Sequence, residues 1–179
     1  MPRFSRVVFT MALLFFSVSP LIAQEVRPRL LSPRDSTRQT IGQANIVVDY
    51  GRPSKRRRTI FGALVPYGVV WRTGANEATH LRTDRDLTIG GVRVPRGTYT
   101  LWTIPERESW TLIINRVTGQ WGTDYDKSQD LARVNMNVTT LDESVEQFTI
   151  AVAPNGARSG VLTMTWDMTQ ASVPIQVEK

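Results

Sequence analysis

Hydrophobic and polar residues alternate with a period of two along most of the chain after residue 40. In the clearest example the even-numbered residues from Ala44 to Tyr50 are apolar, whereas Asn45 and Asp49 between them are polar. A period of two turns successive side chains to opposite faces of a β-strand, so one face of this segment is expected to be buried. The same alternation predicts strands at residues 79–83, 86–89, 92–94, 98–104, 110–114, 132–138, 147–152, 161–166 and 173–177. No segment shows the 3.6-residue period of an amphipathic helix.

Turn-forming residues separate these segments at the spacing of about 8–12 residues that is typical of antiparallel sandwiches and barrels. Gly90-Gly91 lies between two short strands and supplies the positive φ of a tight hairpin. Residues 115–130 hold two glycines and several Asx residues, which predicts a loop. Pro174 lacks an N–H group, so the last strand is expected at a sheet edge. The predicted fold class is all-β: an antiparallel β-sandwich, or flattened barrel, of about nine to ten strands with little helix.

The first 23 residues have the organisation of a secretory signal peptide. Arg3 and Arg6 precede an apolar run from Val7 to Phe16, and Ala23-Gln24 follows a polar breaker. The apolar run is shorter than the roughly 20 residues that span a bilayer, so an uncleaved anchor is the less favoured alternative. We therefore expect a periplasmic or secreted protein.

Removal of residues 1–23 would leave 156 of the 179 residues. That length predicts a single domain. Residues 24–40 contain Pro28, Ser32 and Pro33 and show little periodicity, so we expect an extended leader there and the β-domain at 41–179, with no transmembrane segment after cleavage. The absence of cysteine excludes disulfides, zinc–thiolate sites and a lipid-modified N-terminal cysteine. The remaining 20 basic and 16 acidic residues give a net charge of +4, too mild to predict a nucleic-acid partner. A glycan or an anionic envelope component stays open as a partner.

The stretch from Tyr50 to Thr79 fits neither period and concentrates the candidate chemistry. Arg72 carries a rigid fork of donors that suits carboxylates, phosphates or sugar hydroxyls. Asn76 can donate and accept hydrogen bonds, and Glu77 can accept them or act as a general acid or base. These side chains are predicted to line a polar cleft. In the competing structural interpretation, Arg72 pairs with Glu77 or Asp49 and Asn76 caps its own loop.

Arg52 and two tryptophans complete the predicted ligand-binding site. Arg52 would join the cleft, and either Trp71 or Trp121 would provide a stacking surface. The loop from Gln120 to Asp126, which carries Trp121, is expected to meet the 50–79 stretch at one end of the sandwich. For Trp121 itself we favour a role as a plug at that end.

His80, the only histidine, offers little support for a catalytic or metal site. Glu77 and His80 are three residues apart, so on a strand they point to opposite faces. A catalytic metal usually has three protein ligands, and we expect no metal, no cofactor and a solvated His80. Glu77 could form a glycosidase-like carboxylate pair with Asp49, Asp124 or Asp126, but the sequence does not set their separation. The basic run from Lys55 to Arg58 is expected to be a solvated loop, because screening limits its grip on anions.

Several ordered motifs resemble one family. They are QTIGQ at residues 39–43, YGRPS at 50–54, IFGALVPYG at 60–68, WRTGANEAT at 71–79, GTYTLWTIP at 97–105 and QWG at 120–122. Together they resemble the DUF2911 family of exported bacterial proteins over roughly residues 32–177.

The resemblance implies a secreted or periplasmic bacterial β-domain, but no reaction or substrate. It also implies which residues belong to the family pattern. These are Arg52, Trp71, Arg72, Asn76, Glu77 and the Trp121-Gly122 loop. The chain departs from the pattern at the unbroken basic run, where the family usually has a glycine. His80 is not part of the pattern either.

The function predicted from the sequence is that of an exported, non-catalytic domain that binds a carbohydrate or another polar envelope ligand. The alternative is a metal-free hydrolase or lyase acting on polysaccharide or peptidoglycan. In that case Glu77 would be the general acid or base, and Arg72 with Asn76 would stabilise developing negative charge. A structural self-association domain is a second alternative.

Overall fold

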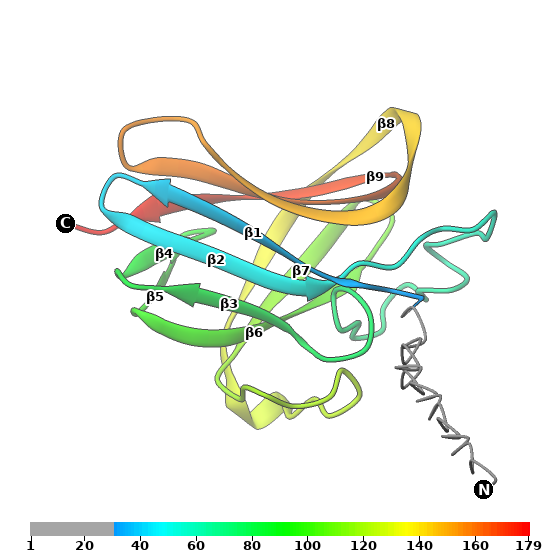
Figure 1. Cartoon of the computed structure of the whole chain (residues 1–179), viewed down its shortest axis with the longest axis horizontal. Helices are drawn as coiled ribbons and strands as arrows, with labels where there is room; N and C mark the ends of the chain where they lie inside the picture. Colours follow the sequence, from blue (N-terminus) through cyan, green and yellow to red (C-terminus); the bar gives the residue numbers. More distant parts are fainter. Residues whose placement is uncertain (1–30) are drawn as a thin grey trace, which may run out of the picture.

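A computed structural model describes residues 31–179, and these form nine β-strands and one short 3₁₀ turn. The predicted signal peptide at 1–23 lies outside the described residues. The strands are β1 (Arg34–Ile41), β2 (Ala44–Gly51), β3 (Thr79–Thr83), β4 (Leu87–Ile89), β5 (Val92–Val94), β6 (Gly97–Pro105), β7 (Ser109–Asn115), β8 (Asp130–Pro154) and β9 (Ser159–Val177), and the 3₁₀ turn η1 is Lys127–Gln129. All pairs are antiparallel, in the order β1-β2-β3-β6-β7-β8-β9-β4-β5, and the sheet does not close. The predicted all-β class is confirmed (Figure 1).

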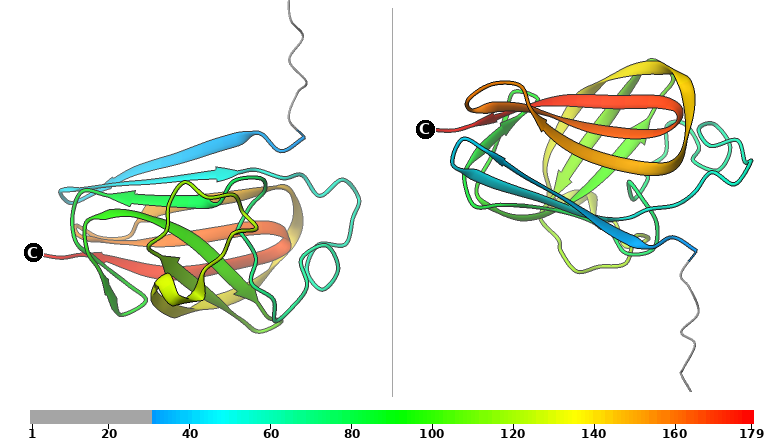
Figure 2. Two further views of the ribbon diagram at one scale, coloured as in Figure 1. Left: turned by 90° about the horizontal axis from the view of Figure 1, so that it is seen from below. Right: turned by 45° about the horizontal axis from the view of Figure 1, so that its top comes forward.

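The long strand β8 makes this single sheet fold over into two layers. Its first part pairs with β7, from Asp130 to Asn137, and its later part pairs with β9, from Asn137 to Pro154. The β8–β9 register shifts between Thr140 and Thr149, where the strand bends. The views in Figures 1 and 2 show β8 and β9 lying over the layer of β2, β3 and β6. The sequence had suggested two separate strands in this region, at 132–138 and 147–152.

The core lies between the two layers and follows the predicted period of two. In β2, Ile46, Val48 and Tyr50 are buried, whereas the residues between them are exposed or half-buried. Trp110 and Trp166 are buried, as their alternation predicted. Burial of one such large apolar side chain contributes about 1.5–3 kcal/mol, so this core stabilises the fold without disulfides.

Two parts of the sheet differ from the sequence prediction. Residues 34–40, expected in an extended leader, form most of β1. Strand β9 as a whole is not the predicted edge strand, because it lies between β8 and β4. Its final segment after Ser172 pairs with β4 alone. Pro174 is tolerated there because β4 pairs only with Ile175 to Val177, so the missing N–H interrupts no paired position.

A second, smaller core covers the outer face of β6 and β7. Trp102 and Ile113 are buried there together with Ala78, and Tyr125 of the loop after β7 packs against them. The loop that carries Tyr125 and Trp121 is therefore held against the sheet rather than extended into solvent. Within residues 31–179, no helix is long and apolar enough to cross a membrane.

Candidate functional site

The two loops that the sequence singled out meet in the structure, as predicted. Glu77 and Trp121 are paired in an isolated antiparallel bridge. The Gly122 N–H donates to the Asn76 carbonyl at 3.0 Å, and the Ala78 N–H donates to the Gln120 carbonyl at 3.3 Å. The bridge holds the 71–77 segment and the 120–126 loop side by side.

Buried threonines hold the 71–77 segment against the sheet. Trp71 and Thr103 of β6 exchange two backbone hydrogen bonds, at 2.7 and 2.9 Å. The Thr73 hydroxyl lies 3.1 Å from the Thr103 hydroxyl, and the Thr79 hydroxyl donates to the Thr73 carbonyl at 2.6 Å. Thr73 has a positive φ of 53°, a strained conformation for a β-branched residue. The surrounding bonds therefore impose the turn that presents Glu77.

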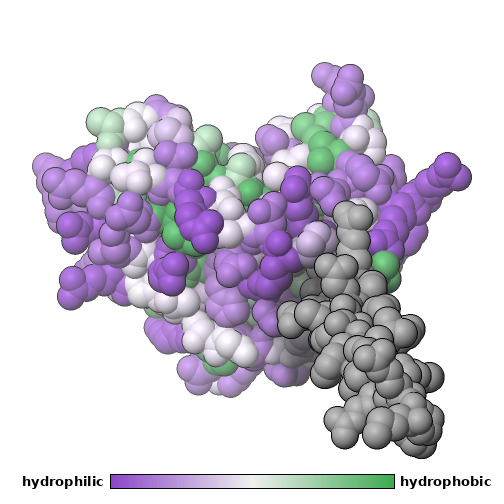
Figure 3. Space-filling model, viewed as in Figure 1, coloured by the Kyte–Doolittle hydropathy of each residue, from purple (hydrophilic) through white to green (hydrophobic). Residues whose placement is uncertain are grey.

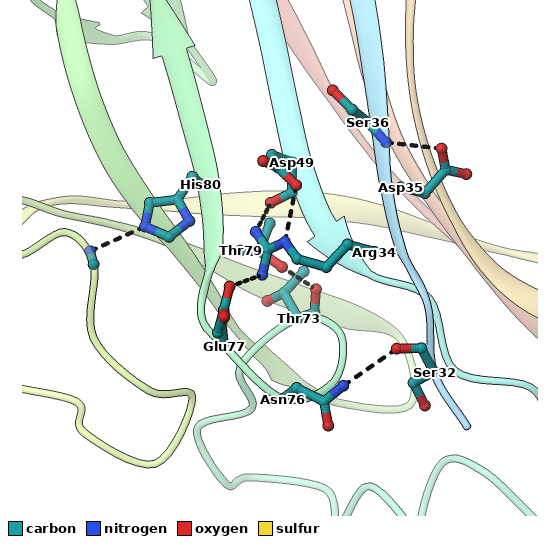
Figure 4. A network of polar contacts seen from close by, with 11 residues as sticks. Ser32, Arg34, Asp35, Ser36, Asp49, Thr73, Asn76, Glu77, Thr79 and His80 are labelled. Atoms are coloured by element: carbon teal, nitrogen blue, oxygen red, sulfur yellow. Dashed lines mark hydrogen bonds and ion pairs between the residues drawn. The ribbon is translucent and has the colours of Figure 1, made fainter. Parts of the chain in front are cut away.

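Glu77 is paired with an arginine that sequence reasoning missed. Arg34 Nη1 lies 2.9 Å from Glu77 Oε2, and Arg34 Nε donates to Asp49 Oδ1 at 3.0 Å (Figure 4). The Glu77 contact has the distance of an ion pair without the alignment of a hydrogen bond. The Glu77 and Asp49 side chains are 54% and 50% exposed. The guanidinium of Arg34 thus contacts two accessible carboxylates. The pairing of Arg72 with Glu77 or Asp49, which the structural interpretation of the sequence expected, is wrong.

Arg72 and Asn76 flank this group in different ways. The aliphatic part of Arg72 lies against Gly122, where an added β-carbon would fall 2.5 Å from Arg72 Cδ. Its guanidinium makes no hydrogen bond or ion pair with the described residues. Asn76 has a φ of 66°, and its side-chain N–H donates to the Ser32 carbonyl at 3.2 Å. Asn76 therefore ties the loop to the segment before β1, instead of capping its own loop.

Arg52 is not brought together with the other predicted site residues. Its guanidinium bonds the Phe148 carbonyl at 3.2 Å and the Thr149 hydroxyl at 3.0 Å, and pairs with Asp35 at 3.2 Å. Asp35 follows Arg34 in β1, and successive strand residues face opposite ways. Arg52 thus braces β1 to β8 on the face opposite to Glu77.

The two candidate tryptophans have opposite environments. Trp71 packs against the core: it stacks on Trp166 with ring centroids 6.0 Å apart and meets the Phe148 ring edge-on at 5.0 Å. Trp121 is 51% exposed. Trp71 and Phe61 fill the place where Trp121 was expected as a plug, so that expectation is wrong. Trp121 is the tryptophan available to a ligand.

His80 is half-buried instead of solvated. Its Nε2 accepts a hydrogen bond from the Gly119 N–H at 3.0 Å, which joins β3 to the loop that carries Trp121. Burial lowers the pKa of His80 below its ordinary value of 6.5, and the positive charge of Arg34 lowers it further. A ring nitrogen that accepts a hydrogen bond must be unprotonated, so His80 is neutral at pH 7. Among the described residues, no three His, Cys, Asp or Glu side chains form a metal-binding group.

A polar cluster beneath the loop was also missed from the sequence. The Tyr125 hydroxyl donates to Asp130 Oδ2 at 2.7 Å and accepts from Arg133 Nη2 at 2.7 Å. Burial and the bond to Asp130 raise the pKa of Tyr125 to about 12. Asn115 donates to the other Asp130 oxygen at 2.9 Å. These contacts fix the base of the loop whose tip exposes Trp121.

The basic run is largely exposed, as expected, at Arg56, Arg57 and Arg58, whereas Lys55 is half-buried and reaches another part of the protein. The Lys55 ammonium binds Asp167 and Ser144 at the β8–β9 bend. Arg58 donates to the Ser54 and Lys55 carbonyls, and Arg56 donates to the Leu31 carbonyl. These contacts hold the loop in place and tie it to the β8–β9 bend and to the segment before β1.

Comparison with known proteins places the chain in one family. It matches the model described as Protein of unknown function (DUF2911) over residues 32–175, and it belongs to that family. The match confirms the family resemblance and includes β1, which the sequence had left in a leader. Neither the curated proteins nor the solved structures contain a significant match.

Proposed function

We propose that the protein is an exported binding domain that takes a carbohydrate on the surface formed by Trp121, Glu77 and Asp49, without catalysis. The pairing of Glu77 with Trp121 carries the proposal. Residues directly opposite each other in an antiparallel bridge project from the same face, with β-carbons about 4.5–5.5 Å apart. An exposed aromatic ring and an exposed carboxylate therefore lie next to each other.

The apolar part of this surface is the indole of Trp121. The other four tryptophans are buried or packed against a core, whereas Trp121 is 51% exposed. An indole has an apolar face and a polar N–H group. Tryptophan is therefore enriched at surfaces that contact an apolar group on one side and water on the other. The C–H face of a sugar ring supplies that kind of apolar surface.

The polar part is the pair of carboxylates held by Arg34. Each carboxylate has several lone-pair directions, and the ion pairs leave others open toward solvent. Sugar hydroxyls are suitable donors for these positions. Because both carboxylates contact the same guanidinium, their positions are set before a ligand arrives, which reduces the ordering cost of binding.

Export rests on the sequence of residues 1–23 and agrees with a domain that needs no cysteine. Cleavage near Ala23 would deliver the domain to the periplasm or the medium of a bacterium. Fractionation of cells, followed by mass spectrometry of the N-terminus, tests this part. A chain that retains Met1 and stays in the cytoplasm would contradict it.

A glycan screen with matched variants tests the binding surface. The purified protein is screened against envelope polysaccharides and peptidoglycan fragments, and each hit is measured by calorimetry. Trp121→Ala is expected to weaken a true hit by about 2 kcal/mol, roughly thirtyfold, as a central tryptophan does in other interfaces. Trp121→Phe should retain part of the affinity, and Glu77→Gln should weaken binding of hydroxyl donors.

The control is Met168→Ala, which removes another partly exposed apolar side chain. It should leave every hit unchanged. Hits that survive Trp121→Ala and the pair Glu77→Gln, Arg72→Ala in a folded protein would refute this surface. Release of shorter glycans from a hit, abolished by Glu77→Gln, would instead favour the hydrolase alternative.

A further inference from the structure

A polar groove lies at the end of the sandwich opposite to the loop that joins β2 to β3. Its volume is about 1000 Å³, within the range of small-ligand sites. Its wall comes from turns that are far apart in sequence: Gly42, Gln43, Asp84, Arg85, Asp86, Arg93, Arg96, Arg158, Val177, Glu178 and Lys179. Strand β2 begins beside this groove and ends near the 71–77 segment, so the two places are separated by the length of the strand. Figure 3 shows hydrophilic side chains gathered at this end, on the left.

Hydrogen bonds between the turns hold the groove in shape. The two Asp86 carboxylate oxygens accept from the Arg96 N–H at 2.8 Å and from the Arg93 guanidinium at 2.6 Å. The Asp86 carbonyl accepts from the Glu178 N–H at 3.0 Å, and the Arg158 carbonyl accepts from the Val177 N–H at 2.8 Å. The wall is therefore built before any ligand binds.

The acidic side chains of the groove are already occupied. Asp86 binds two groups, as described above, and Asp84 accepts from the backbone N–H and the side-chain amide of Asn45 at 2.8 and 2.7 Å. Glu178 accepts from the Thr88 hydroxyl. Arg93 and Arg96 line the groove, whereas Asn45 and Thr88 belong to the adjoining strands β2 and β4. The three carboxylates therefore hold the turns to one another and to these strands.

Three arginines of the groove form no ion pair among the described residues, although, after the hydrogen bonds described above, the charges of Arg85 and Arg96 also help to lower the pKa of Asp84 and Asp86, respectively. Arg85 and Arg96 use only backbone groups in hydrogen bonds, and Arg158 directs its guanidinium to the Val177 carbonyl. Arg93 alone forms an ion pair, with Asp86. An arginine presents paired donors that match planar oxyanions, and several such groups around one concavity attract negative charge.

We propose that this groove is a second ligand site, which binds a molecule carrying at least two oxyanionic groups, either carboxylate or phosphate. Arg85 and Arg96 supply the free guanidinium groups, and Arg158 adds its positive charge to the same concavity. The site is independent of the Trp121 surface in position and in chemistry. The proposal stands whether or not that surface binds a carbohydrate.

Calorimetric titration with defined anions tests the groove. The purified protein is titrated at 150 mM salt with trigalacturonate as the carboxylate probe, tripolyphosphate as the phosphate probe and maltotriose as the neutral probe. We expect one or both anions to bind, and the stronger one identifies the oxyanion. The double variant Arg85→Gln, Arg96→Gln should bind that anion at least about tenfold more weakly, because each of the two substitutions removes a charge-assisted hydrogen bond to the anion.

The matched control removes the same charge elsewhere. Arg38 on β1 and Arg57 in the loop after β2 are exposed, and their side chains make no hydrogen bond with the described residues. Arg38→Gln, Arg57→Gln should bind the anion within about twofold of the unaltered protein, since distant exposed charges are largely screened at this salt concentration. The single variant Arg96→Gln replaces the double variant if thermal unfolding shows that the double variant is destabilised. The proposal is overturned if neither anion binds, if the two charge-removal variants weaken binding equally, or if the groove variant binds normally.

Discussion

Gly122 lies so close to Arg72 that a β-carbon at Gly122 would fall 2.5 Å from Arg72 Cδ and 2.5 Å from the Asn76 carbonyl oxygen. Gly122→Ala should therefore displace the loop that carries Trp121 and cost about 1–3 kcal/mol of the free energy of unfolding, as overpacking does elsewhere. Urea denaturation measures this cost.

A double-mutant cycle identifies which contact causes the loss of stability in Gly122→Ala. Arg72→Ala removes the flexible side chain but leaves the Asn76 carbonyl in place. Gly122→Ala combined with Arg72→Ala should thus recover only part of the lost stability. Unchanged stability in Gly122→Ala would show that the two segments are not in the close contact described.

Trp71 and Trp121 should respond in opposite ways to replacement by alanine. Trp71 packs in the aromatic core, and Trp71→Ala should lower the free energy of unfolding by about 3–5 kcal/mol. Trp121 is largely in water, and Trp121→Ala should change it by no more than about 0.5 kcal/mol. Denaturation monitored by circular dichroism measures both values without relying on tryptophan fluorescence. Equal losses would contradict the assignment of one ring to the core and the other to the surface.

The His80 contact predicts a loss of stability in mild acid. The pKa of His80 is lowered in the folded state, so between that value and the ordinary 6.5 the unfolded chain binds more protons. Stability is therefore full above about pH 6.5 and falls as the pH drops through the folded-state pKa. His80→Gln has an oxygen that can accept from Gly119 and does not titrate, so its unfolding temperature should fall less over this window. Parallel curves for the two proteins between pH 7 and 5 would rule out this role.

The raised pKa of Tyr125 predicts a separate loss of stability in alkaline solution. Its pKa is raised to about 12, so the unfolded chain loses this proton first, and stability falls as the pH rises from about 10 to 12. An absorbance titration should lose one phenolate step near pH 12 in Tyr125→Phe. The same variant loses the bonds to Asp130 and Arg133, and should be about 1–3 kcal/mol less stable at neutral pH. A titration step that persists in Tyr125→Phe would assign it to another tyrosine.

The alternation of apolar residues was sufficient to predict most of the sheet. In β2 burial alternates as the apolar pattern predicted, and in β9 it does so on either side of an interruption at 167–170. In β7 the predicted face is buried, and so is the other face at Ile113 and Asn115. The prediction failed for β1, whose residues are mostly polar on both faces. Such an edge strand has little apolar surface to bury, so no period of two marks it. Arg34 was missed for the same reason.

The candidate site was predicted in part. Motif density located the 71–77 segment and the loop at 120–126, and the structure joins them through Glu77 and Trp121. The ion-pair partners of the arginines were harder to predict, because the sequence offers several carboxylates that a surface arginine could contact. Glu77 pairs with Arg34, 43 positions away, and Arg52 turns to β8. The roles of Trp71 and Trp121 likewise depend on which of the two rings packs against the core, and this is set by the tertiary structure.

The sequence by itself determined the all-β class, the inward faces of most strands and the stretches where polar residues gather, because these depend on local periodicity and on turn chemistry. Only the tertiary structure decided which charges meet and which surfaces stay open. Long-range pairing brings β1 beside β2, folds β8 across both layers and closes a groove from turns that are distant in the chain. No local pattern encodes those contacts, since each depends on where two remote segments come to lie once the core is buried.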